Sequence, residues 1–140
     1  MKPIVGVGEI LWDIFPDGSK VAGGAPFVGM VGLHRVNPAL PSAPAVEVGW
    51  RLHPDHWGHG YATEAAAASL DYGFGPAGLD EIVAFTTTLN TRSQAVMQRI
   101  GMVRDPAGDF DHPSLPEGSP LRRHVLFRAR ASQTRPTVTP

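Results

Sequence analysis

Residues 57–65 form the segment whose residue types and spacing point most directly to chemistry. The segment reads Trp-Gly-His-Gly-Tyr-Ala-Thr-Glu-Ala, and its two glycines, Gly58 and Gly60, immediately precede an alanine-rich stretch. Glycines let a backbone close tightly around a ligand. The first turn of a helix adds N–H groups without an intrahelical partner and the positive end of the helix dipole. A glycine turn that opens a helix therefore predicts a site for a phosphate-bearing ligand.

A strand before this turn and a helix after it must position the site. Residue character alternates over 46–52, which predicts a strand with Val48 and Trp50 on one face and Glu47 on the other. Small and apolar residues then recur at helical spacing, which predicts a helix over about 60–74. The order strand, glycine turn, helix is the arrangement that an anion-binding site requires.

The rest of the chain predicts a second helix and further strands. The second helix is expected from Asn90 to Ile100, with Asn90 or Thr91 as its N-cap and Gly101 just past its end. Strands are expected over 4–7, 10–15, 27–36, 81–88 and 123–130, a long loop over 105–120 and a disordered tail over 131–140. This order predicts an α/β (α+β) domain in which helices cross a mixed, mostly antiparallel sheet.

The composition argues against several classes of function. The chain has 140 residues, a formal net charge of −1 and no cysteine. We therefore expect one core, no general attraction to nucleic acid or membranes, no disulfide and no thiolate metal site. The missing cysteines and the lack of a long apolar run fit a cytoplasmic protein. His53, His56 and His59 are spaced by three, but in a strand-to-loop segment, so no metal site is expected there.

The region 27–130 resembles the GNAT N-acetyltransferases and looks closest to the branch of ribosomal-protein N-terminal acetyltransferases. The resemblance rests on an ordered set of motifs rather than on any one of them. The motifs are Phe27-Val28-Gly29-Met30-Val31-Gly32-Leu33, Val46-Glu47-Val48-Gly49-Trp50, Gly58-His59-Gly60-Tyr61-Ala62-Thr63-Glu64-Ala65 and Asn90-Thr91-Arg92-Ser93, followed by Met97, Ile100, Gly101 and Met102. The resemblance implies the acyl-CoA acyltransferase fold of that family, here truncated at its N-terminal side.

The resemblance implies acetyl-CoA as the acetyl donor, bound by main-chain groups at the strand end and the glycine turn. The implied cofactor-binding residues are Trp50, Arg51, Leu52, Gly58, His59, Gly60, Tyr61, Ala62, Thr63 and Asn90. A main-chain N–H near Leu52 would polarise the thioester carbonyl. The family usually has Arg or Gln where this chain has Trp57, so a cationic side chain is missing from the turn itself.

Two residues are the candidates for proton transfer. Attack on a thioester needs a neutral amine, and Glu47 is the candidate base, directly or through a water. A solvated carboxylate on a strand surface is the alternative interpretation of Glu47. Many family members use a Tyr as the acid that protonates the departing thiolate, but Met97 stands there, and Ser93 is the nearest remaining hydroxyl. Direct protonation by water is equally open, and Asn90 and Ser93 are also explained as helix-capping residues.

Residues 1–26 resemble a different family, the fructokinase-like sugar kinases of the ribokinase family. The resemblance lies in 5–18 and in Gly23-Gly24-Ala25-Pro26, and it implies that Asp13 and the glycine pair contact a sugar. The kinase's catalytic Asp and ATP loop are absent, so kinase activity is not expected. We expect the two strands of this segment to pair with the exposed edge of the sheet, and Trp12, Ile14 and Phe15 to cover it.

Three functions remain open from the sequence. The first is transfer of acetyl from acetyl-CoA to a primary amine, either a protein N-terminus or a small molecule. The second is a CoA-binding or inactive structural remnant, because the family's N-terminal helices usually wall the acceptor site. The third, sugar binding by the kinase-like segment, is remote. Either a monomer or a homodimer is compatible with the sequence.

Overall fold

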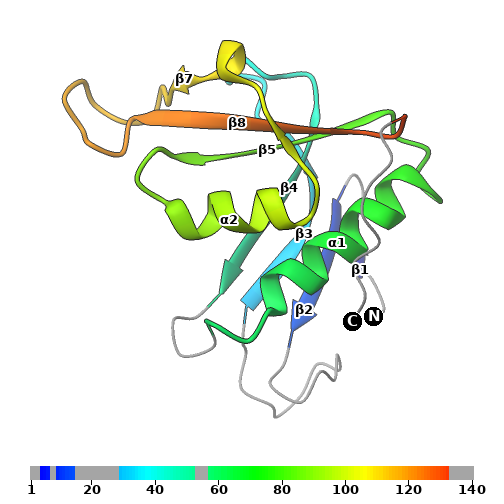
Figure 1. Ribbon diagram of the computed structural model, residues 1–140. Coiled ribbons are helices and arrows are strands. Elements are labelled where there is room, and N and C mark those ends of the chain that lie inside the picture. The colour runs from blue at the N-terminus through cyan, green and yellow to red at the C-terminus, as the bar shows by residue number, and fades with distance from the viewer. Residues whose placement is uncertain (1–3, 7–8, 15–28, 53–56, 133–140) are drawn as a thin grey trace.

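Eight strands and two helices make up the described part of the chain (Figure 1). This computed structural model describes residues 4–6, 9–14, 29–52 and 57–132, with side chains from residue 31 onward. In chain order the elements are β1 (Ile4–Gly6), β2 (Glu9–Ile14), β3 (Gly29–Arg35), β4 (Val46–Leu52), α1 (Tyr61–Phe74), β5 (Glu81–Thr87), α2 (Thr91–Arg99), β6 (Val103–Arg104), a short 3-10 helix (Pro106–Gly108), β7 (Phe110–Asp111) and β8 (Arg123–Arg130).

The strands form one sheet in the order β1-β2-β3-β4-β5-β8-β6, with β7 also paired to β8. Among the described strands, β4 and β5 make the only parallel pair, in register at Glu47 and Val83. A parallel pair needs a crossover connection, and α1 supplies it. The predicted fold class, a mixed and mostly antiparallel sheet crossed by helices, is confirmed.

The two N-terminal strands extend the sheet beyond β3. β1 pairs with β2, and β2 pairs with β3 from Ile10 opposite Leu33 to Ile14 opposite Gly29. The prediction that this segment pairs with the sheet edge is confirmed. The predicted covering role of Trp12, Ile14 and Phe15 concerns side chains that lie outside the described residues.

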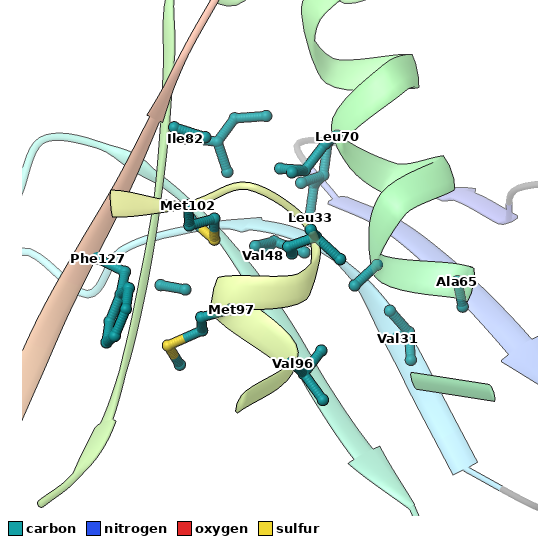
Figure 2. Packing of buried hydrophobic residues seen from close by; sticks show 14 of the residues in the cluster. Val31, Leu33, Val48, Ala65, Leu70, Ile82, Val96, Met97, Met102 and Phe127 are labelled. Atoms are coloured by element: carbon teal, nitrogen blue, oxygen red, sulfur yellow. The ribbon is translucent and has the colours of Figure 1, made fainter. Parts of the chain in front are cut away.

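Helix α1 packs closely on the sheet because its inner face is small. Its buried residues are Ala65, Ala66, Ser69, Leu70 and Gly73. A Cβ added at Gly73 would come within 2.5 Å of Ile82 Cδ1, so glycine permits the approach of helix and strand there. Figure 2 shows Ala65 and Leu70 of α1 facing Val31 and Leu33 of β3. The predicted helical face is confirmed.

Helix α2 covers the same face of the sheet as α1. Its Val96 and Met97 join the core cluster that α1 enters (Figure 2). The helix begins after Asn90, whose side-chain oxygen accepts a hydrogen bond from the Ser93 N–H at 3.1 Å. Gly101 follows the helix with a φ of 86°, a left-handed conformation that suits glycine. The predicted N-cap and the terminating glycine are confirmed.

The predicted loop over 105–120 is partly wrong, because the region contains a 3-10 helix and β7, and β6 precedes it. These pieces are two or three residues long, too short to show a periodicity in the sequence. They are held by Asp109, whose side chain accepts from the Leu126 N–H at 3.1 Å and pairs with Arg104. Of the predicted tail, Ala131 donates to the Asp80 carbonyl at 2.9 Å, and residues 133–140 lie outside the described part.

Candidate functional site

The candidate site begins where β4 and β5 separate. Their register pair is at Glu47 and Val83, and no further β4–β5 register pair follows within the described residues. β4 continues to Leu52 while paired with β3 on its other side. Figure 1 shows the two strands diverging toward their C-terminal ends, with α2 near the opening. The edge of β4 from Val48 to Leu52 is therefore left for another extended chain to bind.

The glycine turn follows β4 and opens α1. Gly58 and Gly60 have φ values of 83° and 76°, which glycine adopts without strain. No heavy atom of the described residues lies within 4 Å of a Cβ built at either position, so the space above the turn is open. Gly60 is the N-cap and provides no side-chain cap, so the first N–H groups of α1 are left for a ligand. These features fit an anion such as a pyrophosphate.

A hydrogen bond joins the first turn of α2 to β4 across the opening. The indole N–H of Trp50 donates to Ser93 Oγ at 3.2 Å, while the Ser93 N–H is held by Asn90. Trp50 packs against the core on the helix-covered face, as the alternation predicts. The structure thus brings together Trp50, Asn90 and Ser93, three of the predicted site residues.

Trp57 connects the glycine turn to both neighbouring elements. Its indole N–H donates to the Leu52 carbonyl at the end of β4, at 3.1 Å. The guanidinium of Arg92 makes a cation–π contact with its ring, with Cζ 4.8 Å from the ring centroid. His59 stacks on Tyr61 in the first turn of α1, with ring centroids 5.3 Å apart. The strand end, the turn and the start of α2 therefore form one contiguous site.

The predicted base lies on the opposite face of the sheet from the helices. Glu47 is only 8% exposed, and its carboxylate contacts His34 Nε2 on the neighbouring strand β3. The two residues face each other in the β3–β4 register. The His34 ring lies over Gly49, where an added Cβ would come within 3.2 Å of Cε1. Glu47 is thus a buried, partnered carboxylate, and the interpretation as a solvated surface residue is wrong.

An aromatic cluster lies further along the same face. Phe85 follows Val83 by two residues on β5, and its ring meets that of Phe110 edge-on, with centroids 5.3 Å apart. His124 stacks on Phe110 at 5.3 Å and lies 5.1 Å from the ring of His112. The sequence did not predict this cluster, because its members come from β5, from β7 and the residue after it, and from β8.

Two residues at the site were not predicted from the sequence: Arg92 had a faint signal and His34 had none. Arg92 places a cation in the first turn of a helix, where the dipole disfavours it, and α2 has no acidic residue in that turn. Such a cation could have been recognised as a functional candidate. His34 gave no signal, because only the strand register brings it to Glu47.

An ion-pair network at the other end of β8 is structural. Arg128 binds Glu81 and Asp105 at 2.6 Å each, and Arg130 binds Glu81 at 3.0 Å. Burial raises the pKa of Glu81, but hydrogen bonds from Arg130 and Arg128 outweigh this and leave the pKa lowered. The hydrogen bond from Arg128 likewise lowers the pKa of Asp105. The charged side chains of this network bind one another. None of them belongs to the glycine turn.

The described residues contain neither a metal-binding cluster nor a membrane-spanning helix. Within the described residues, no three His, Asp or Glu side chains converge into a metal site, and His53 and His56 lie outside those residues. Neither described helix has the length and apolar character needed to cross a membrane.

Comparison with known proteins identifies the class. The family model described as "Acetyltransferase (GNAT) domain" matches residues 7–103, more than half of the chain. The chain belongs to the GNAT acetyltransferase family. The matched range includes most of the kinase-like segment, and the boundary predicted between residues 26 and 27 stays a prediction.

Two curated relatives match part of the sequence of this chain. An uncharacterized N-acetyltransferase, YnaD of Bacillus subtilis, is 40% identical over 73 residues, covering 52% of this chain and 41% of that protein. The FsC-acetyl coenzyme A-N(2)-transacetylase of Aspergillus fumigatus is 39% identical over 107 residues, covering 71% of this chain and 46% of that protein. The chain thus spans less than half the length of these relatives.

Solved structures share the fold. An acetyltransferase of the GNAT family from Bacillus anthracis is 31% identical with a TM-score of 0.63, covering 81% of this chain and 64% of that one. The ribosomal-protein-S5-alanine acetyltransferase of Vibrio fischeri is 21% identical with a TM-score of 0.61, covering 79% of this chain and 57% of that one. At that identity the likeness shows the fold alone. The ribosomal-protein branch and the sugar-kinase resemblance stay predictions.

Proposed function

We propose that the chain transfers the acetyl group of acetyl-CoA to a primary amine. The observation that carries the proposal is the edge of β4 beyond Glu47 together with the open glycine turn at the start of α1, the next described segment of the chain. An extended amide-containing arm that ends in a phosphate fits a strand edge followed by a helix N-terminus. Membership of the GNAT family supports acetyl-CoA as that ligand.

The donor is held mainly by main-chain groups. Trp50, Arg51 and Leu52 bind the pantetheine arm along the strand edge. The turn and the first turn of α1 bind the pyrophosphate, through Gly58, His59, Gly60, Tyr61, Ala62 and Thr63. Asn90 contacts the arm at the opening, where its side-chain oxygen already caps α2 and its amide N–H groups remain as donors.

Glu47 and His34 together act as the base. The amine nitrogen attacks the thioester carbonyl carbon, the new C–N bond forms, the C–S bond breaks and one proton leaves the nitrogen. Glu47 is buried and paired with His34, an arrangement in which a carboxylate orients an imidazole. The pair takes up the amine proton, directly or through a water.

Ser93 supplies a proton to the departing thiolate. Its Oγ accepts the hydrogen bond from Trp50, so the hydroxyl keeps its own proton to donate. Its place in the first turn of α2, beside β4, puts it at the opening that the donor arm occupies. Protonation by water is the competing route, and the Ser93 variant below separates the two.

The acceptor approaches on the face that carries Glu47. That face is opposite α1 and α2, and the cluster of Phe85, Phe110, His112 and His124 adjoins it along β5. The acceptor class is a primary amine, either a protein N-terminus or a small molecule. The relative from Aspergillus fumigatus is named an acetyl coenzyme A-N(2)-transacetylase, which supports transfer to a nitrogen but does not separate the two choices.

A second candidate function is CoA binding without turnover. The chain spans less than half the length of the curated relatives it matches. In this second function the donor half of the site binds CoA, and no amine is acetylated.

Release of free thiol separates the two. The protein is incubated with acetyl-CoA and a panel of primary amines, and the thiol of CoA is followed with a colorimetric reagent. The chain has no cysteine, so it contributes no background. Amine-dependent release is the expected result. CoA binding without release favours the second function, and absence of CoA binding contradicts both.

A further inference from the structure

Arg92 brings a positive charge to a turn that has none of its own. The turn reads Trp57-Gly58-His59-Gly60 and contains no Lys or Arg. Arg92 Cζ lies 4.8 Å from the centroid of the Trp57 ring, so its guanidinium sits over the residue that begins the turn. Trp57 is itself fixed by the hydrogen bond from its indole N–H to the Leu52 carbonyl.

The backbone under Arg92 is held on both sides. Asn90 caps the helix by accepting from the Ser93 N–H, and Ser93 Oγ accepts from the indole of Trp50. Arg92 stands between these two anchored residues. The start of its side chain is therefore fixed relative to β4 and the glycine turn, and only the side-chain torsions remain to be ordered.

The charge of Arg92 lacks a partner of opposite sign in the described part of the chain. No ion pair there includes Arg92, and the side chain is exposed. The α2 dipole disfavours a cation in the first turn. An anion bound beside Arg92 would offset this cost.

Contact with Trp57 leaves the guanidinium able to bind an anion. A cation–π contact uses none of the N–H donors of the guanidinium. Those donors can bind a phosphate with two parallel hydrogen bonds. The space at a Cβ built on Gly58 or Gly60 is open for such a ligand.

We propose that Arg92, whose guanidinium lies over the Trp57 ring, binds a phosphate group of the CoA donor and supplies the cation that the glycine turn lacks. This inference rests on the proposed function. The phosphate belongs either to the pyrophosphate, which the turn amides also bind, or to the 3′-phosphate of the ribose. Both groups have the same chemistry, and CoA and dephospho-CoA distinguish them.

The test is calorimetric titration of CoA and of dephospho-CoA into four proteins. These are the unaltered chain, Arg92→Ala, Arg92→Lys and Arg99→Ala. Arg99 is the matched control, since it is an exposed arginine in the last turn of the same helix. Thermal unfolding of each protein without ligand verifies that all four are folded.

We expect Arg92→Ala to weaken CoA binding by about ten- to a hundredfold, the effect of losing charge-assisted hydrogen bonds. Arg92→Lys should bind CoA more tightly than Arg92→Ala and more weakly than the unaltered chain, because lysine keeps the charge but not the planar set of N–H donors. Arg99→Ala leaves the affinity unchanged within about twofold. An equal loss with both ligands assigns Arg92 to the pyrophosphate, and a loss with CoA alone assigns it to the 3′-phosphate.

Equal CoA affinity of the unaltered chain and Arg92→Ala would overturn the inference while leaving the proposed function intact. The same holds if Arg99→Ala weakens binding as much as Arg92→Ala, because the effect would then be general charge. Failure of the unaltered chain to bind CoA would overturn the proposed function and the inference with it.

Discussion

The indole N–H of Trp50 on β4 donates a 3.2 Å hydrogen bond to Oγ of Ser93 in the first turn of α2. The bond spans the opening that forms where β4 separates from β5 beyond Glu47. It joins the strand whose edge would bind the donor arm to the helix that would supply a proton and a cation.

The variants Trp50→Phe and Ser93→Ala remove the same hydrogen bond but differ in whether the hydroxyl remains. Each is expected to destabilise the fold by about 1 kcal/mol. If Ser93 protonates the thiolate, Ser93→Ala slows acetyl transfer by about tenfold or more beyond Trp50→Phe. Single-turnover rates with acetyl-CoA and an active amine provide the measurement. Equal rates for the two variants would assign the proton to water.

Glu47→Gln keeps the size of the side chain and removes its charge. We expect transfer to slow by about a hundredfold while CoA affinity is unchanged, because Glu47 lies on the face opposite the helices and away from the glycine turn. His34→Gln should also slow transfer, since it breaks the pair. Glu117→Gln, at an exposed position, is the control.

An unchanged transfer rate in Glu47→Gln would remove Glu47 from the mechanism.

Gly60→Ala and Gly78→Ala form a matched pair for the glycine turn. Both glycines have positive φ, 76° and 65°, and both have open space at a built Cβ. Alanine at either should therefore cost about 1 kcal/mol of stability through backbone strain alone. Only Gly60→Ala should weaken CoA binding in calorimetry, because Gly78 follows α1 at its other end. Equal CoA affinities would argue against the turn as the phosphate site.

Acid should destabilise the protein through the network around Arg128. The pKa values of Glu81 and Asp105 lie below their ordinary values of 4.5 and 3.8. A lowered carboxyl pKa contributes stability that is present above the unfolded value and lost as pH falls through the folded value. The melting temperature should therefore drop as pH falls below about 4.5.

Glu81→Gln tests this assignment. Its melting temperature should be lower by roughly 2–4 °C at pH 7, and the difference should shrink at acid pH. Glu117→Gln, whose exposed side chain belongs to no ion pair in the described part of the chain, is the control. A difference that persists unchanged at acid pH would point to packing rather than charge.

Deletion of residues 1–14 tests the role of the N-terminal strands. β2 pairs with β3 over five residue pairs, so its loss exposes the edge of β3. We expect a lower melting temperature and a tendency to aggregate, since an unpaired edge is a template for other strands. Light scattering and thermal unfolding are the measurements, and an unchanged melting curve would contradict the prediction.

The elements with a clear period were predictable. The structure confirms, within one or two residues, the alternating strand over 46–52 and the small buried face of α1. It also confirms the caps of α2 at Asn90 and Gly101. β6, β7 and the 3-10 helix were not predicted, because pieces of two or three residues carry no period. The aromatic cluster was missed for a related reason, as its rings come from segments that are far apart in the chain.

The sequence by itself determined the strand, glycine turn and helix that make an anion site, because each depends on local backbone preferences and on spacing along the chain. Only the tertiary structure decided what surrounds them. Strand register brings His34 to Glu47, and the packing of α2 over the opening brings Ser93 to Trp50 and Arg92 to Trp57. These contacts join residues far apart in the chain, so no local pattern encodes them; they follow from how the sheet and helices bury their apolar faces together.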